Sequence, residues 1–85
     1  MSAIEKIIAG IVELFPEVGD LTLDADTPLG AIPGFDSMAA VNLQTYLEEV
    51  FKTTVFLEIL NAETTIGELA VYLTDPQKMA AALKR

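Results

Sequence analysis

Residues 36–51, DSMAAVNLQTYLEEVF, decide the fold, because their apolar residues repeat with the spacing of an amphipathic helix. At about 100° per residue, one side of this predicted helix collects a core face: Ala40, Leu43, Leu47, Val50 and Phe51. The opposite side collects Met38, Val41, Thr45 and Glu48, with Asn42 and Glu49 flanking them. The stretch therefore predicts a helix that packs along one face and exposes a small apolar spot bordered by carboxylates.

A second amphipathic helix is predicted upstream of this one. Ser2 and Glu5 have the spacing of a capping box at its start, and Pro16 ends its pattern. The buried stripe between them is predicted to consist of Ile4, Ile7, Ile8, Ile11 and Phe15. Gly10 lies in the middle of this helix, where glycine costs about 1 kcal/mol relative to alanine. Nothing in the sequence explains it.

Residues 16–36 form a long connection that proline and glycine punctuate. Loops of this length are unusual inside a compact domain and are often functional. Four apolar residues are expected to pin the loop to the core: Leu21, Leu23, Leu29 and Ile32. The loop contains Asp24 and Asp26, but a calcium-binding reading fails. In a 12-residue EF-hand loop counted from Asp24, the required glycine stands at position 6 and a glutamate at position 12. Here the glycine, Gly30, falls at position 7, and position 12 is Phe35.

Downstream of the central helix, residues 52–63 are predicted to be a connector. Its apolar segment 55–60, VFLEIL, is expected to form one or two helical turns and mainly to fill the core. Thr65 and Glu68 have the spacing of a second capping box. A helical stripe follows them, made of Ile66, Leu69, Ala70 and Leu73.

Asp75 and Pro76 suit the N-cap and the first position of one more helix, so residues 76–85 are predicted to form a short extra helix ending in Lys84 and Arg85. The fold class is therefore all-α: a small bundle of three main helices plus a short fourth, with a long first loop and an extra C-terminal helical turn. With 85 residues, the chain is expected to form a single domain over residues 1–85.

Composition excludes several function classes. Thirteen acidic against five basic residues give a net charge of −8, which disfavours nucleic acid and anionic lipid and favours partners with basic patches. The chain has no cysteine and no histidine, so it lacks disulfides, a thiolate nucleophile and a Ser-His-Asp triad. No apolar run approaches the roughly 20 residues of a membrane span, and the N-terminus does not resemble a signal peptide. We expect a soluble cytoplasmic protein.

Ser37 is the leading candidate for a functional side chain. The sequence has two serines, and Ser2 is explained as a helix cap. Ser37 lies where a loop containing Pro33 and Gly34 meets the start of the central helix. Either Asp36 or Ser37 could serve merely as that helix's N-cap. Alternatively, a phosphate esterified to Ser37 would be stabilised by the backbone N–H groups and dipole of the helix start.

The residues around Ser37 make the chain similar to a known family. Gly34-Phe35-Asp36-Ser37-Met38, with Val41, Leu43, Leu47-Glu48-Glu49 and Phe51 downstream, resembles the Ser-bearing second helix of acyl carrier proteins. Helix order, loop length, acidity and the Thr-initiated helix at Thr65-Ile66-Gly67-Glu68-Leu69-Ala70 extend the resemblance over nearly the whole chain.

The resemblance implies that a phosphopantetheinyl transferase (holo-carrier synthase) attaches 4′-phosphopantetheine covalently to Ser37, with Asp36 helping the transferase to recognise the site. The cofactor would hold acyl groups as thioesters. Met38, Val41, Glu48 and Glu49 match positions that such carriers offer to partner enzymes. Those partners would be acyltransferases or acyl ligases and ketosynthases with basic docking patches. The carrier itself would be no enzyme, would bind no metal, and would be a monomer.

Some residues depart from the family's pattern. Ala39 and Asn42 stand where many members carry acids, the segment 55–60 is strongly apolar, and a tail follows Pro76. These departures favour a specialised carrier with its own partner set, or a surface that binds another protein, over a carrier of housekeeping fatty-acid synthesis. The pathways implied are fatty-acid, polyketide or related specialised lipid biosynthesis. Two alternatives stay open: a peptidyl or aminoacyl carrier, and an unmodified acidic helical adaptor in which Ser37 is only a cap. A carboxylate-based enzyme is disfavoured, because so small a domain offers little cleft.

Overall fold

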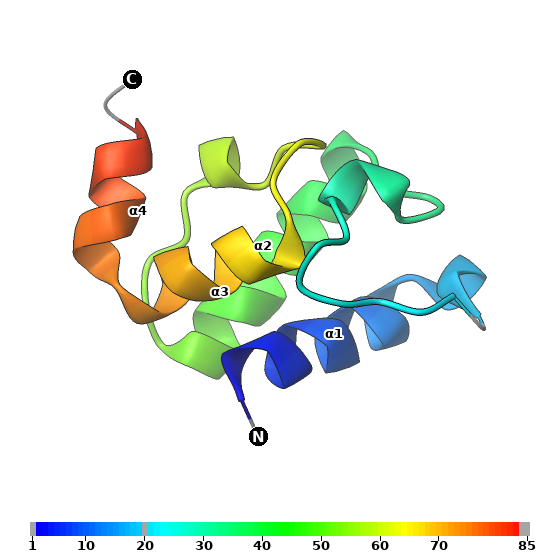
Figure 1. Cartoon of the computed structure of the whole chain (residues 1–85). Coiled ribbons are helices and arrows are strands. Elements are labelled where there is room, and N and C mark those ends of the chain that lie inside the picture. Colours follow the sequence, from blue (N-terminus) through cyan, green and yellow to red (C-terminus); the bar gives the residue numbers. More distant parts are fainter. Residues whose placement is uncertain (1, 20, 84–85) are drawn as a thin grey trace.

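The computed structural model describes residues 2–19 and 21–83, and these residues form four α-helices and three short 3₁₀ helices. The α-helices are α1 (Ala3–Leu14), α2 (Ser37–Phe51), α3 (Ile66–Thr74) and α4 (Pro76–Leu83); the 3₁₀ helices are η1 (Pro16–Val18), η2 (Leu29–Ala31) and η3 (Leu57–Ile59). Within the described ranges the only extended pairing is an isolated bridge between Pro28 and Thr65. The all-α prediction is confirmed, and Figure 1 shows the arrangement.

Helix α1 begins and ends where the sequence predicted. The Ser2 hydroxyl accepts the Glu5 N–H at 3.2 Å, and the Glu5 carboxylate accepts the Ser2 N–H at 3.0 Å, which completes the predicted capping box. Gly10 now has an explanation. A Cβ atom built at this position would overlap the ring of Tyr46 on α2, so glycine allows the two helices to approach closely. The Tyr46 hydroxyl also donates to the Lys6 carbonyl at 3.4 Å.

Helices α3 and α4 also follow their predicted caps. Thr65 and Glu68 form the second capping box, and Asp75 accepts the Gln77 N–H at 3.1 Å where α4 begins. Helix α4 packs against α3 and η3 and buries Met79. The predicted continuation over Lys84 and Arg85 lies outside the described residues.

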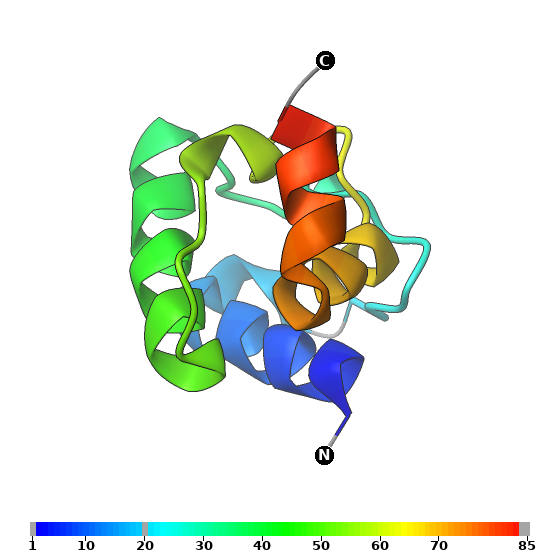
Figure 2. The ribbon, with the colours of Figure 1, turned by 90° about the vertical axis from the view of Figure 1, so that its left-hand side faces the viewer.

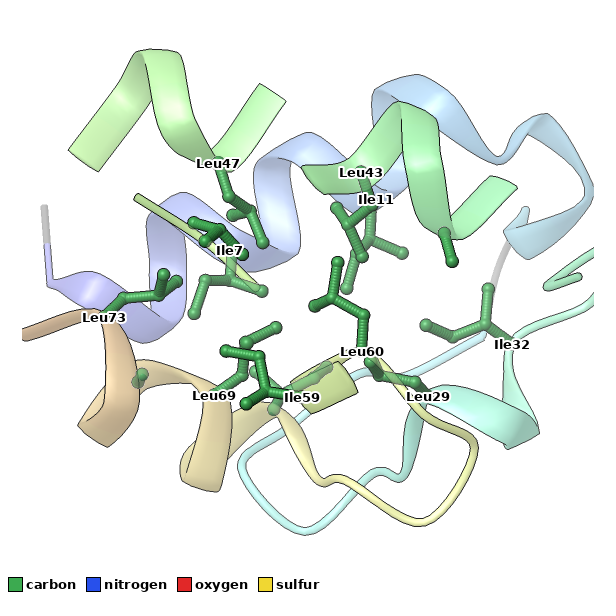
Figure 3. Close-up of a cluster of buried hydrophobic side chains, with 14 of the residues drawn as sticks. Ile7, Ile11, Leu29, Ile32, Leu43, Leu47, Ile59, Leu60, Leu69 and Leu73 are labelled. Carbon is green, nitrogen blue, oxygen red and sulfur yellow. The ribbon is translucent and has the colours of Figure 1, made fainter. Parts of the chain in front are cut away.

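The hydrophobic core lies between α1, α2 and α3, with contributions from the connecting segments. Figure 3 shows side chains from all of these converging: Ile7, Ile11, Leu29, Ile32, Leu43, Leu47, Ile59, Leu60, Leu69 and Leu73. Two of the residues predicted to be core, Val50 and Phe51, are only partly buried. Phe51 packs against the edge of the core, and Lys6 Nζ lies over its ring, 5.8 Å from the ring centre.

The long first loop is held to the rest of the molecule by its own backbone. Leu29 N–H and Gly30 N–H donate to the carbonyls of Thr64 and Ala62, each at 2.9 Å. These bonds fix the loop against the segment that precedes α3, as the cyan and yellow ribbons in Figure 1 show. We call this pairing of residues 25–30 with 62–67 the loop seam.

One prediction about the loop was wrong. Leu29 and Ile32 are buried and Leu23 is partly buried, but Leu21 is 51% exposed. Its N–H donates to the Val18 carbonyl at 2.9 Å, so the chain turns directly after η1, and Val18 fills the core there instead.

The described part of the chain contains no helix that is both long and apolar enough to cross a membrane.

Candidate functional site

Asp36 and Ser37 mark the start of α2. Asp36 is the N-cap, because its backbone is extended and its Oδ1 accepts the Ala39 N–H at 2.9 Å. Ser37 is the first helical residue and its side chain is exposed. The sequence left open which of the two caps the helix. The structure assigns that task to Asp36, so the Ser37 hydroxyl is not needed for it.

A tight turn positions this pair. Gly34 has φ of 84°, a conformation that strongly favours glycine, and Phe35 N–H donates to the Ile32 carbonyl at 3.1 Å. A Cβ atom at Gly34 would lie 2.7 Å from Glu17 Oε2, so the Glu17 carboxylate rests against the turn. No sequence pattern indicates this contact, because residues 17 and 34 meet only in the folded chain.

An apolar hollow of about 350 Å³ opens beside Ser37. Its lining comes from the turn, α2 and the segment around η3: Phe35, Asp36, Ser37, Ala40, Leu57, Leu60 and Ala62. The ring of Phe15 packs against that of Phe35, with the two ring centres 6.2 Å apart. The exposed hydroxyl of Ser37 therefore stands at the edge of a largely apolar surface.

The predicted partner residues on α2 are not all equally available. Met38 is 74% exposed, Val41 is 44% exposed, and Glu49 is also exposed. Glu48 is only partly exposed, and its Oε2 accepts the Val55 N–H at 3.0 Å. The structure thus places Met38, Val41 and Glu49 on the outer surface, whereas the Glu48 carboxylate is already engaged within the chain.

The apolar segment 55–60 divides between core and surface. Val55, Ile59 and Leu60 are buried, which agrees with the predicted core-filling role. Phe56 and Leu57, however, are 43% and 41% exposed, so for these two the prediction was wrong. Residues 52–60 run beside α2, as Figure 2 shows, and Gln44 Nε2 donates to the Val55 carbonyl at 2.7 Å. Leu57 therefore shares the hollow with Ser37.

Ser37 lies next to an exposed carboxylate, that of Asp36. The sequence holds no lysine or arginine in residues 7–51 or 53–77, and Glu49 is a further exposed carboxylate on α2. Residues 2–19 and 21–83 contain no group of three or more potential metal ligands. Asp24 closes a turn in the long loop: its Oδ1 accepts the Asp26 N–H at 2.9 Å and the Thr27 hydroxyl at 3.1 Å.

A second hollow, of about 410 Å³, lies between α3 and the end of α4. Its lining includes Glu58, Glu63, Glu68 and Tyr72 and shares no residue with the hollow at Ser37. None of the predicted site residues lines it.

Comparison with known proteins supports the resemblance inferred from the sequence. A family model described as a phosphopantetheine attachment site matches residues 2–73, which is most of the chain. Domains of this family are non-catalytic carriers that hold 4′-phosphopantetheine covalently on a serine, so the cofactor and non-enzyme predictions are confirmed at the level of the family. No curated protein and no solved structure matches the chain significantly.

Proposed function

Because the chain belongs to the phosphopantetheine attachment-site family, we propose that it is an acyl carrier protein whose cofactor is attached to Ser37. The matched region contains both serines of the sequence. Ser2 is engaged in the capping box of α1, where its hydroxyl accepts the Glu5 N–H. Ser37 has an exposed hydroxyl directly after the cap of α2, and this single observation carries the proposal.

The residues at the start of α2 fit a phosphodiester. The first N–H groups of a helix have no acceptor within the helix, and the helix dipole favours an anion there. Asp36 is also negative, but its carboxylate accepts the Ala39 N–H, which offsets part of its charge. When bound, 4′-phosphopantetheine supplies the thiol that this cysteine-free chain lacks.

Acyl cargo is favoured over aminoacyl or peptidyl cargo by the hollow beside Ser37. Only Asp36 and Ser37 contribute polar side chains to its lining. An alkyl group that binds there leaves water, which is favourable by a free energy of about 0.8 kcal/mol for each buried CH₂. The ammonium of an aminoacyl group would lose hydration with little compensation. We therefore propose that the hollow shelters the first part of an apolar acyl group.

This preference can be tested by NMR. Loading the protein with a hexanoyl group should shift the methyl signals of Ala40, Leu57 and Leu60, whereas a glycyl group should shift them less. Val12, an exposed residue of α1 outside the hollow, is the control signal. Equal shifts for both cargoes, or none, would contradict the preference for acyl groups.

The carrier would deliver its cargo to enzymes of fatty-acid, polyketide or related specialised lipid biosynthesis. We propose that the whole chain, residues 1–85, is one cytoplasmic carrier domain that works as a monomer, with residues 76–85 as a C-terminal extension. Met38, Val41 and Glu49 would contact partner enzymes, and Glu48 would contribute negative charge from a partly buried position. The acidic surface would draw these partners in through basic docking patches. Acyltransferases, acyl ligases and ketosynthases are the partner classes proposed.

The attachment site is tested directly by mass. The purified protein is incubated with coenzyme A, Mg²⁺ and a broad-specificity phosphopantetheinyl transferase, and the intact mass is recorded for wild type, Ser37→Ala and Ser2→Ala. Wild type and Ser2→Ala should each gain one phosphopantetheine, and Ser37→Ala none. Modification of Ser37→Ala would refute the assignment of the site. An unmodified wild type with a helical circular dichroism spectrum would favour the acidic adaptor, or a carrier that needs a dedicated transferase.

A further inference from the structure

The second hollow, between α3 and the end of α4, has the size of a ligand site and an acidic lining. Its volume of about 410 Å³ lies within the range of about 300–1,000 Å³ that small-molecule sites occupy. Three glutamates line it: Glu58, Glu63 and Glu68. Among the described residues no lysine or arginine lines it, and Lys78, one turn before Ala82 on α4, lies outside the lining. We call this space the acidic hollow.

The acidic hollow also contains a buried polar side chain without a partner, that of Thr64. Thr64 is only 7% exposed. Its N–H donates to Asn61 Oδ1 at 3.1 Å and its carbonyl accepts the Leu29 N–H at 2.9 Å, but its hydroxyl forms no hydrogen bond with any residue that the structure describes. Every fully enclosed side-chain nitrogen or oxygen in the described ranges has a partner. The Thr64 hydroxyl therefore reaches open space, and the acidic hollow is the space that Thr64 lines.

The acidic residues of this hollow stand on a backbone that is already fixed. Asn61 Nδ2 donates to the Glu58 carbonyl at 3.1 Å, and Asn61 Oδ1 accepts the Glu63 N–H at 3.0 Å. Glu68 Oε1 accepts the Thr65 N–H at 2.9 Å in the second capping box. A ligand that binds here does not have to order these segments, which lowers the entropic cost of binding.

Two further features of the acidic hollow favour a positively charged ligand. Ala82 and Leu83, the last two residues of α4, line it, so the negative end of the α4 dipole lies there. Figure 2 shows this end of α4 beside η3, against which the helix packs. Tyr72 adds an aromatic ring, and the face of such a ring attracts cations.

The spread of the carboxylates decides which kind of cation fits. Residues 2–19 and 21–83 contain no group of three or more acidic side chains placed to hold one metal ion. The lining also includes apolar side chains, those of Ile59 and Leu83. Carboxylates that do not converge, together with apolar surface, fit a chain of CH₂ groups that carries two or more ammonium groups. Ammonium groups are pure donors, which suits carboxylates and an unpaired hydroxyl.

We propose that the acidic hollow binds a linear aliphatic polyamine, whose ammonium groups donate to its glutamates and to the Thr64 hydroxyl. The binding is non-covalent and offsets part of the chain's net charge of −8. It does not depend on the proposed attachment of a cofactor at Ser37, because the two hollows share no lining residue.

The experiment titrates spermidine into the full chain, residues 1–85, in 0.15 M NaCl and follows backbone amide signals by NMR. Salt at this concentration limits attraction to distant charges, since the Debye length is about 8 Å. The amide signals of Glu63, Thr64 and Leu83 should shift and saturate, whereas those of Val12 and Ser37, which lie outside the acidic hollow, should not. Butylamine, which has one ammonium group, should bind about fivefold more weakly because it forms fewer ion pairs.

Matched variants test the residues of the site. Glu63→Gln and Thr64→Val should each raise the dissociation constant about threefold, since each removes one acceptor for an ammonium group. Glu13→Gln removes the same charge from an exposed position on α1 outside the hollow, and it should leave the dissociation constant nearly unchanged. Circular dichroism confirms that each variant is folded.

The outcomes that would overturn the proposal are distinct. Shifts that do not saturate, or equal weakening by Glu63→Gln and Glu13→Gln, would show that spermidine responds only to net charge. Tighter saturation of the same signals by Mg²⁺ would assign the hollow to a metal ion. Lys84 and Arg85 lie outside the described residues. If spermidine bound only after both were replaced by alanine, the hollow would serve the chain's own C-terminal residues. None of these outcomes affects the mass test at Ser37.

Discussion

Asp36 and Ser37 are neighbours with different tasks, and substitutions can separate them. Asp36 caps α2 through its bond to the Ala39 N–H, and its charge lies beside the proposed attachment site. Asparagine keeps a capping oxygen but removes the charge, whereas alanine removes both.

Asp36→Ala should therefore lower the free energy of unfolding by about 1 kcal/mol, while Asp36→Asn should leave it nearly unchanged. Both variants should be modified more slowly than wild type if the transferase recognises the carboxylate. Urea denaturation and the mass-based rate measure the two effects separately. A normal rate for Asp36→Asn would show that only the cap matters.

Gly10 shows two opposing effects at one position. Alanine would gain about 1 kcal/mol of helix propensity, but its Cβ would overlap the Tyr46 ring. Overpacking of this kind costs about 1–3 kcal/mol, so Gly10→Ala should be destabilising in net terms. In a Tyr46→Ala background the same substitution should become neutral or stabilising. A double-mutant cycle in urea checks this, and additive effects would exclude the contact as the cause.

Glu5 links the first capping box to pH. The Ser2 N–H bonded to its carboxylate lowers the pKa of Glu5 below its usual value, and the Ser2 hydroxyl adds to this effect. A pKa that is lower in the folded state stabilises the fold above the unfolded pKa, near pH 4.3, and this contribution is lost as pH falls through the folded value. Carboxyl ¹³C NMR should show Glu5 titrating below the ordinary glutamate range, and Ser2→Ala should raise the pKa of Glu5.

At the scale of elements, α4 lies beyond the residues that the family model matches, yet it belongs to the packed structure. Met79 is buried, and α4 packs against both α3 and η3. Helix η3 contributes Leu57 to the lining of the hollow beside Ser37. Because α4 packs against η3, it supports this side of the candidate site.

Met79→Ala should lower the free energy of unfolding by roughly 2–4 kcal/mol, since it removes a buried side chain and leaves a cavity. Gln77→Ala, at an exposed position of the same helix, is the control and should change it little. Urea unfolding followed by circular dichroism measures both. Equal stability of the two variants would mean that α4 does not hold η3 in place.

The helices could be predicted from the sequence because their signals are local. Ser2 and Thr65 cap α1 and α3 as the sequence predicted, and Asp36 caps α2, one of the two residues that the sequence offered for that position. Ser37 as the attachment site stays a prediction, drawn from its place at the helix start and from the family resemblance. The exposure of Phe56 could not be predicted from the sequence. A run of apolar residues does not reveal which of them point outward when bonds from Gln44 and Glu48 set the register.

At the scale of the whole molecule, charge is the dominant feature. Thirteen acidic residues against five basic ones give a compact chain that repels itself. Salt screens this repulsion, because the Debye length falls from about 30 Å at 0.01 M to about 8 Å at 0.15 M. The urea midpoint should therefore rise with NaCl over this range. A midpoint that falls would show that attractive ion pairs outweigh the repulsion.

The loop seam has a consequence for the order in which the protein is made. Residues 1–51 include Ser37 and the whole of α2, but the carbonyls that hold the long loop belong to Ala62 and Thr64. Leu57, Leu60 and Ala62, which complete the surroundings of Ser37, also come later in the chain. On a ribosome, the serine thus emerges before the structure that presents it. A nascent chain ending near residue 51 would present Ser37, the proposed attachment site, without the hollow beside it. Any recognition that depends on this hollow would wait until residues 57–62 have been synthesised.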